Sequence, residues 1–157
     1  MCDPIIYKTA LSIGVFKDFC PSGQKLVKDH ITRAKYRLQA LDTLFSIGAY
    51  ADVVRESQEI VELSLKVLLR ETNIEVPRIH DVSSIIVEHA PRLLHIGQAE
   101  REFLIESSRQ LRRDLELAFY GTEDLTPSEF YKKKDAEIAK EMATRVVSIV
   151  DGAITLE

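Results

Sequence analysis

The stretch Gly48–Leu69, GAYADVVRESQEIVELSLKVLL, decides the fold. Its apolar residues recur at Val54, Val61, Leu65 and Leu68, which is the period of an α-helix. More apolar residues lie beside these four, so the apolar stripe covers more than about 100° of the helix surface. We therefore expect a central helix that contacts neighbours on several sides. Its polar residues are few: Arg55, Glu56, Gln58, Glu59, Glu62 and Lys66.

Length and composition indicate an ordinary single domain. The chain has 157 residues, of which 45% are apolar and 29% charged. A net charge of −4 means that the molecule as a whole will not attract nucleic acid, so such binding needs a local basic patch and we expect no DNA. No apolar run approaches the ~20 residues that span a bilayer, and no signal peptide is evident. We therefore expect a cytoplasmic protein without a membrane segment.

The first 24 residues are the least regular part of the chain. Their apolar residues fit neither the helical nor the strand period, and Cys20-Pro21-Ser22-Gly23 is typical of a loop. We predict an N-terminal arm at residues 1–24, followed by a helical domain at residues 25–157. The two cysteines, Cys2 and Cys20, both lie in the arm; free thiols and a bridge between them are the two alternatives.

Start and stop signals divide the rest into helices near residues 24–47, 49–71, 82–89, 99–120 and 126–153. Gly48 is a plausible stop for the first helix, and Asp81 can cap the short one. Thr126-Pro127-Ser128-Glu129 predicts a capping box at the start of the last helix. No strand, repeat or low-complexity tract is apparent. The predicted fold class is all-α, an up-down bundle of four long helices plus a short helix.

Metal and nucleophile motifs are absent from the sequence. His80, Asp81, His89 and His95 lie close together, but not at the i, i+4 spacing of a helical zinc pair. His80-Asp81 also occurs in HD-type phosphohydrolases, but the surrounding residues do not resemble that family. Neither a glycine-rich nucleophile elbow nor a phosphate-binding GxxxxGK[ST] loop is present. We expect no metal, no cofactor and no catalytic residue of these classes.

Basic residues offer the remaining chemistry. Arg112 and Arg113 follow Arg109 by three and four positions in the helix predicted near residues 99–120, so the three arginines share a side. The planar fork of arginine suits phosphate. The alternative is pairing along the same helix with its acidic residues, which are Glu102, Glu106, Asp114 and Glu116.

Three stretches, in this order, resemble the HEPN family (higher eukaryotes and prokaryotes nucleotide-binding domain). The resemblance covers about residues 29–149 and leaves the arm outside it. The stretches are Ala34-x-Tyr36-x-Leu38 with Leu41 and Gly48-x-Tyr50-Ala51-x-x-Val54-x-x-Ser57-x-Glu59-x-x-Glu62-x-Ser64-Leu65-Lys66-x-Leu68-Leu69; Ile79-His80-Asp81-Val82; and Arg113 with Ala118-Phe119-Tyr120-Gly121, Tyr131 and Asp135-Ala136-Glu137.

The resemblance implies a helical bundle that forms a homodimer and, in prokaryotes, often occurs beside a minimal nucleotidyltransferase in a toxin–antitoxin pair. Many members of the family are metal-independent ribonucleases. Their motif is an Arg, a polar residue and, a few residues later, a His. Such chemistry needs a His as acid and base on the ribose 2′-OH and an Arg on the phosphate.

This chain departs from the family motif, because none of its four histidines follows an Arg at that spacing. The matching stretch is Arg113-Asp114, five residues and Tyr120, and tyrosine, with an ordinary pKa near ~10, is a poor base at neutrality. We therefore predict a non-catalytic module that binds a nucleotide, RNA or a partner such as a nucleotidyltransferase. The predicted ligand-binding residues are Arg113, Asp114, Tyr120, Arg55 and His80.

Two alternatives stay open. One is a toxin-like, metal-independent ribonuclease with a variant Arg113 and Tyr120 site. The other is a scaffold whose arm, residues 1–24, docks on another chain. Glu59 and Glu62 are expected to orient arginines or to set the register of a dimer rather than to touch a ligand.

Overall fold

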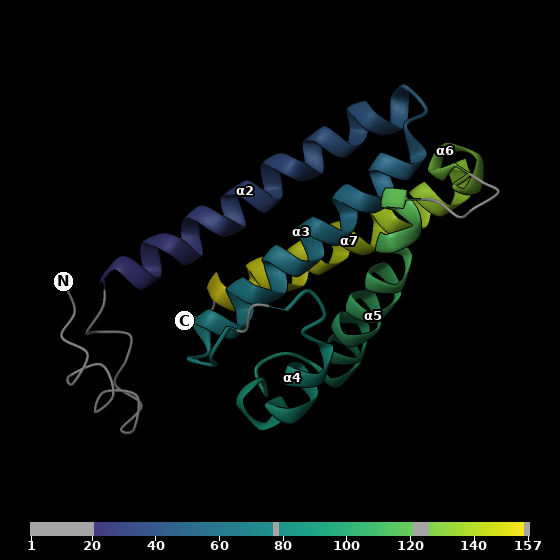
Figure 1. Cartoon of the computed structure of the whole chain (residues 1–157). Helices are drawn as coiled ribbons and strands as arrows, with labels where there is room; N and C mark the ends of the chain where they lie inside the picture. Colours follow the sequence, from purple (N-terminus) through teal and green to yellow (C-terminus); the bar gives the residue numbers. More distant parts are fainter. Residues whose placement is uncertain (1–20, 77–78, 121–125, 156–157) are drawn as a thin grey trace.

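A computed structural model describes residues 21–76, 79–120 and 126–155 of the chain, except for the side chains of residues 21–22, 113–120 and 155. These residues form helices and loops without a strand, so the predicted all-α class is confirmed (Figure 1). Residues 1–20 lie outside the described residues, and with them most of the predicted arm and both cysteines. No helix among the described residues is long and apolar enough to cross a membrane.

The first two long helices are α2 (Pro21–Ser46) and α3 (Tyr50–Glu71). Helix α2 begins three residues before the predicted position, so the loop expected at residues 21–23 is wrong. Pro21 is compatible with this start because a proline at the first helical position loses no hydrogen bond. The turn after α2 is as predicted: Gly48 takes φ +77°, a left-handed conformation that glycine adopts cheaply.

The other two long helices are α5 (Gln98–Tyr120) and α7 (Lys133–Thr155). Consecutive long helices run in opposite directions, as predicted for an up-down bundle (Figure 1). Ion pairs mark the antiparallel register of α2 against α7, since Lys35 Nζ lies 2.7 Å from Asp151 Oδ1 and Lys140 pairs with Asp42. Helices α3 and α7 therefore run parallel to each other.

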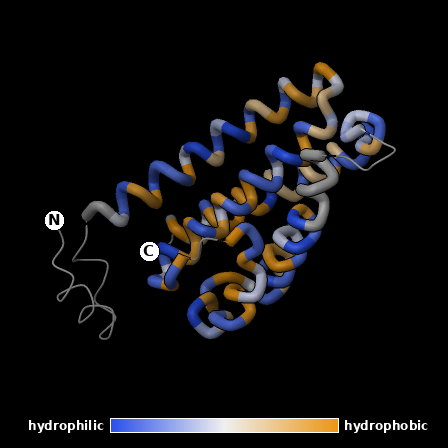
Figure 2. The backbone as a smooth tube through the Cα atoms, in the orientation of Figure 1, coloured by the Kyte–Doolittle hydropathy of each residue, from blue (hydrophilic) through white to orange (hydrophobic). Residues whose placement is uncertain are grey.

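Helices α3 and α7 form the middle of the bundle, with α2 packed on one side and α5 on the other. The central position predicted for α3 is confirmed, because it contacts all three other long helices. Its wide apolar stripe is the reason, and Val53, Ile60, Leu65, Val67 and Leu68 in it have no exposed surface. In Figure 2, hydrophobic residues recur along all four long helices, whereas α2 also carries long hydrophilic stretches between them.

Short elements connect α3 to α5. The connection contains α4 (Ser83–Glu88) and the 3₁₀ turn η1 (Ala90–Arg92), so Pro91 lies in a second short turn rather than ending the first. Asn73, two residues after the end of α3, takes φ +56°, and Arg92 Nη1 donates to its carbonyl at 3.2 Å. Arg101 of α5 donates to the carbonyls of Leu93 and Ile96. These two arginines hold the connection against both long helices.

The predicted last helix is in fact two helices. The capping box at Thr126 is present, with its N–H donating to Glu129 at 2.9 Å, but it opens only the four-residue α6 (Pro127–Phe130). Tyr131 then adopts an extended conformation and is buried. Helix α7 begins with a second signal, because the N–H of Lys132 donates to Asp135 at 2.8 Å. From there the predicted apolar face is confirmed, and Ala136, Ala139, Val146 and Ala153 are buried.

Candidate functional site

Two adjacent residues, His80 and Asp81, connect the two long helices α3 and α5. The His80 imidazole pairs with Glu62 of α3, and the Asp81 carboxylate accepts a hydrogen bond from Ser108 of α5. The dipeptide lies directly before α4, so both side chains are placed by the start of that helix. The polar edge formed by α3, the start of α4 and α5 is our candidate site, and we call it the α3–α5 edge.

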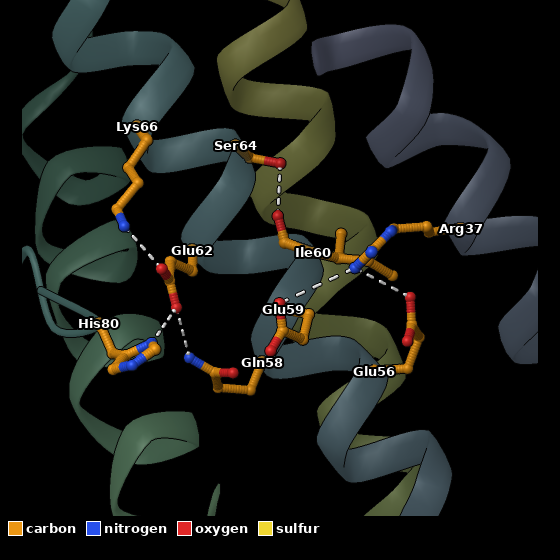
Figure 3. A network of polar contacts seen from close by, with 9 residues as sticks. All are labelled: Arg37, Glu56, Gln58, Glu59, Ile60, Glu62, Ser64, Lys66 and His80. Atoms are coloured by element: carbon orange, nitrogen blue, oxygen red, sulfur yellow. Dashed lines mark hydrogen bonds and ion pairs between the residues drawn. The ribbon is translucent and has the colours of Figure 1, made fainter. Parts of the chain in front are cut away.

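Glu62 is the buried end of the first connection (Figure 3). Its side chain is only 13% exposed, and its Oε2 lies 2.9 Å from Nδ1 of His80. Gln58 Nε2 donates to the same oxygen at 3.1 Å, and Lys66 Nζ donates to Oε1 at 2.6 Å. Burial alone would raise the pKa of Glu62, but the hydrogen bonds from Lys66, His80 and Gln58 outweigh it and lower the pKa. Glu62 is therefore an ionised carboxylate that fixes the imidazole of His80 through Nδ1, on the buried side of the ring.

Asp81 is the second connection. Its Oδ1 accepts from the N–H of Ser83 at 2.8 Å, which is the capping role predicted from the sequence, although Val82 occupies the N-cap position itself. The same atom accepts from Ser108 Oγ at 3.0 Å. Burial would raise the pKa of Asp81, but the bonds from Ser83 and Ser108 and the charge of Arg109 outweigh it and lower the pKa.

Arg109 leaves its own helix and reaches α4. Its Nε donates to Ser83 Oγ at 3.3 Å, and its charge acts on Asp81. The alternative considered from the sequence was pairing with acidic residues along α5. Among the described side chains, Arg109 contacts Ser83 of α4 and makes no ion pair with Glu102 or Glu106. The side chains of Asp114 and Glu116 lie outside the described residues. Its side chain is exposed, so it presents a guanidinium at the surface beside the His80-Asp81 pair.

Arg55 belongs to the same helix as Glu62, near the point where α3 faces the C-terminal half of α5. Val54 and Leu111 line one pocket of about 250 Å³, which sets α3 and α5 level at that point. Arg55 lies two turns before Glu62 on α3 and therefore on a similar face of the helix. Its Nε is 3.8 Å from Asp52, and its side chain is half-buried. Of the predicted residues, His80 is thus held at the α3–α5 edge by Glu62, and Arg55 shares the face of α3 that carries Glu62.

Three predicted residues are placed by their backbone alone. Arg113, Asp114 and Tyr120 belong to α5, which continues to Tyr120, but their side chains lie outside the described residues. Position 113 follows Arg109 by one helical turn. The four histidines lie elsewhere: His30 is on α2, and His80, His89 and His95 are in the connection between α3 and α5.

The other predicted carboxylate, Glu59, lies one helical turn before Glu62 and points toward Arg37 of α2 rather than toward His80 (Figure 3). Arg37 of α2 reaches Glu56 at 3.2 Å and Glu59 at 3.9 Å. Glu59 thus pairs with an arginine, as expected, whereas the partners of Glu62 are a lysine, a histidine and a glutamine. Among the described residues, no group of three His, Cys, Asp or Glu side chains could hold a metal ion.

Buried polar side chains lie on both α3 and α5. Ser57, Gln58, Ser107 and Ser108 are all buried, and within the described part of the chain Ser57 Oγ, Gln58 Oε1 and Ser107 Oγ have no hydrogen-bond partner. The sequence analysis did not identify Ser83 or Ser108, and it named Arg109 as a basic candidate without including it among the predicted ligand-binding residues. A usable signal was present: two serines at 107 and 108 interrupt the apolar face of α5 at helical spacing from Leu104 and Leu111.

Comparison with known proteins gives one match. The family model described as HEPN domain matches residues 27–153, which is most of the chain. Neither the curated proteins nor the solved structures contain a significant match.

Proposed function

The chain belongs to the HEPN domain family, and from this we propose that it is a binding module for a nucleotide or RNA, which it holds by phosphate groups at the α3–α5 edge. The family assignment supports a nucleotide- or RNA-related role. Arg109 and Arg55 contribute positive charge to this edge, and position 113 extends it by one turn of α5. Arginine forks suit phosphate oxygens better than any other side chain.

The observation that carries the proposal is the exposed guanidinium of Arg109. Its Nε is tied to Ser83, which leaves its two terminal nitrogens without a hydrogen bond among the described residues. A guanidinium held by one nitrogen loses less side-chain entropy when a ligand binds to the other two. This arrangement favours a ligand contact over a purely structural ion pair.

We propose further that the Arg113 and Tyr120 motif on α5 is non-catalytic. No histidine lies on α5, and a tyrosine hydroxyl is a weak base near neutral pH. Phosphate binding by Arg113 needs no proton transfer, so it survives the replacement of the family histidine. We also propose a homodimer, with a minimal nucleotidyltransferase as a protein partner, in the cytoplasm; family membership is the support for each.

The test uses purified protein, a labelled single-stranded RNA and EDTA. We expect RNA to bind without being cut, with an affinity that falls as salt rises because the contacts are to phosphate. Arg113→Ala should weaken binding about tenfold, since a charge-assisted contact contributes roughly 1.5–3 kcal/mol. Arg33→Ala on α2, on the other flank of the bundle, removes the same charge and should leave binding unchanged.

Either of two results would contradict this proposal. RNA cutting that Arg113→Ala abolishes would establish the alternative, a ribonuclease with an Arg and Tyr site. Affinity that does not change with salt would remove the role assigned to the arginines.

A further inference from the structure

His80 and Arg109 are two exposed side chains, and each is fixed by one contact to a neighbouring residue. The His80 side chain is 59% exposed, and its Nδ1 is taken by Glu62. Arg109 is held through Nε, the guanidinium nitrogen closest to its own backbone. Within the described residues, His80 Nε2 and the two terminal nitrogens of Arg109 make no hydrogen bond. These are the atoms that a ligand approaching the α3–α5 edge would meet.

One residue, Asp81, links the segments that carry both groups. It is the chain neighbour of His80, and its Oδ1 fixes the start of α4 to Ser108. The residue that anchors Arg109 is Ser83, whose N–H is bound by the same oxygen. The imidazole and the guanidinium are therefore attached to the same hydrogen-bonded network rather than to two independent loops.

The protonation state of the imidazole decides what His80 Nε2 can do. If Nδ1–H donates to Glu62, the neutral ring has only a lone pair at Nε2, which an anion avoids. The protonated ring has an N–H there, which donates to phosphate. The charged groups around the imidazole are Glu62, which it contacts, Lys66, which pairs with the same carboxylate, and its chain neighbour Asp81, on which the charge of Arg109 acts.

We propose that His80 and Arg109 form a phosphate subsite whose affinity depends on the protonation of His80. This inference rests on the proposed nucleotide or RNA binding and specifies where one phosphate is held. Glu62 and Asp81 are positioning residues in it and do not touch the ligand.

The two carboxylates do not obscure the effect. The pKa values of Glu62 and Asp81 are both lowered, so both groups stay ionised throughout the range of about pH 5 to 8 in which histidine changes charge. Phosphate affinity should therefore rise as pH falls through that range.

The experiment measures binding of the same labelled RNA, in EDTA and at fixed ionic strength, at about pH 5.5 and 7.5. Wild-type protein should bind about tenfold tighter at the lower pH, the effect of one charge-assisted hydrogen bond. His80→Asn keeps a donor for Glu62 without a titrating ring, and it should remove most of this ratio. His80→Lys carries a permanent charge, so it should bind at the higher pH as tightly as wild type does at the lower.

Two further variants separate this subsite from the rest of the site. Arg109→Ala should weaken binding at both pH values, whereas Arg33→Ala serves as the matched control and should change neither. Circular dichroism and a thermal melt of each variant establish that it is folded.

The outcomes distinguish the two proposals. If His80→Asn keeps the full pH ratio, or if Arg109→Ala binds as wild type does, the subsite is refuted. If RNA binding is independent of pH but still weakens in Arg113→Ala, the subsite falls and the proposed function stands. If wild-type protein binds no RNA at either pH, both fall.

Discussion

The two flanks of the bundle, α2 and α5, pack on the same central pair of helices but do so differently. Helix α2 adds a regular apolar seam of Ile31, Ala34 and Leu41 and exposed ion pairs to α3 and α7. Helix α5 adds buried serines, and through α4 it joins a network that ends at His80 and Arg109. The α2 flank therefore has the features of a purely structural contact. The α5 flank also carries a polar network that packing alone does not require.

The largest expected effect is a loss of stability that is similar for the two flanks, because both bury apolar side chains completely. Leu41 of α2 and Leu104 of α5 both have no exposed surface. Leu41→Ala and Leu104→Ala should each lower the free energy of unfolding by about 2–5 kcal/mol, because each removes buried methyl groups and leaves a cavity. Urea denaturation measures both. Leu94→Ala, at a side chain 74% exposed, is the control and should change little.

The next effect is specific to the α5 flank. Glu62→Gln should lower the free energy of unfolding at pH 7 by about 1–2 kcal/mol, because it weakens the bonds to Lys66 and His80. The lowered pKa of Glu62 means that its contribution is present above the ordinary value of 4.5 and is lost as pH falls below it. The difference between variant and wild type should therefore shrink in acid. A difference that is constant from pH 7 to about pH 3 would contradict this account.

Asp81 should affect binding more than stability. Asp81→Asn keeps an oxygen for Ser83 and Ser108, so we expect a loss of about 1 kcal/mol in the free energy of unfolding. The neutral amide holds these donors and the guanidinium less firmly, so RNA affinity at low pH should fall several-fold. Parallel urea and RNA-binding titrations test this. Asp81→Glu keeps the negative charge but places the carboxylate one methylene farther from the backbone. If Asp81 acts by positioning the site, this variant should recover the free energy of unfolding better than the RNA affinity.

The smallest effect belongs to the α2 flank. Arg37 is 35% exposed, and its contacts with Glu56 and Glu59 are partly solvated. Arg37→Ala should cost no more than about 1 kcal/mol, should cost less in high salt, and should leave RNA binding unchanged. Loss of RNA binding in this variant would mean that the two flanks are not functionally distinct.

Much of the fold follows from local sequence patterns. The apolar stripe of Gly48–Leu69 identified the central helix, and Gly48 identified the turn before it. The capping box at Thr126 was real, yet it did not show that Tyr131 would interrupt the helix, because an extended conformation there depends on burying the tyrosine ring in the assembled bundle. The local sign of the second helix start is Asp135, whose carboxylate accepts a hydrogen bond from the N–H of Lys132.

The candidate site could be predicted only in part. Spacing placed Arg109, Arg112 and Arg113 on one side of a helix. It could not predict that Arg109 contacts Ser83, a residue of a different helix. The HEPN resemblance pointed to His80-Asp81 without indicating that the two side chains bind different helices.

The sequence by itself determined the helical class, the order of the helices and the absence of a histidine from α5, because these depend on residue identity and on periods of three to four residues. The tertiary structure decided that Glu62 contacts the imidazole of His80 and that Ser83 accepts a hydrogen bond from Arg109. Such pairs are separated by many residues, and whether they meet depends on the loop path and helix register, which the packing of all four long helices sets together.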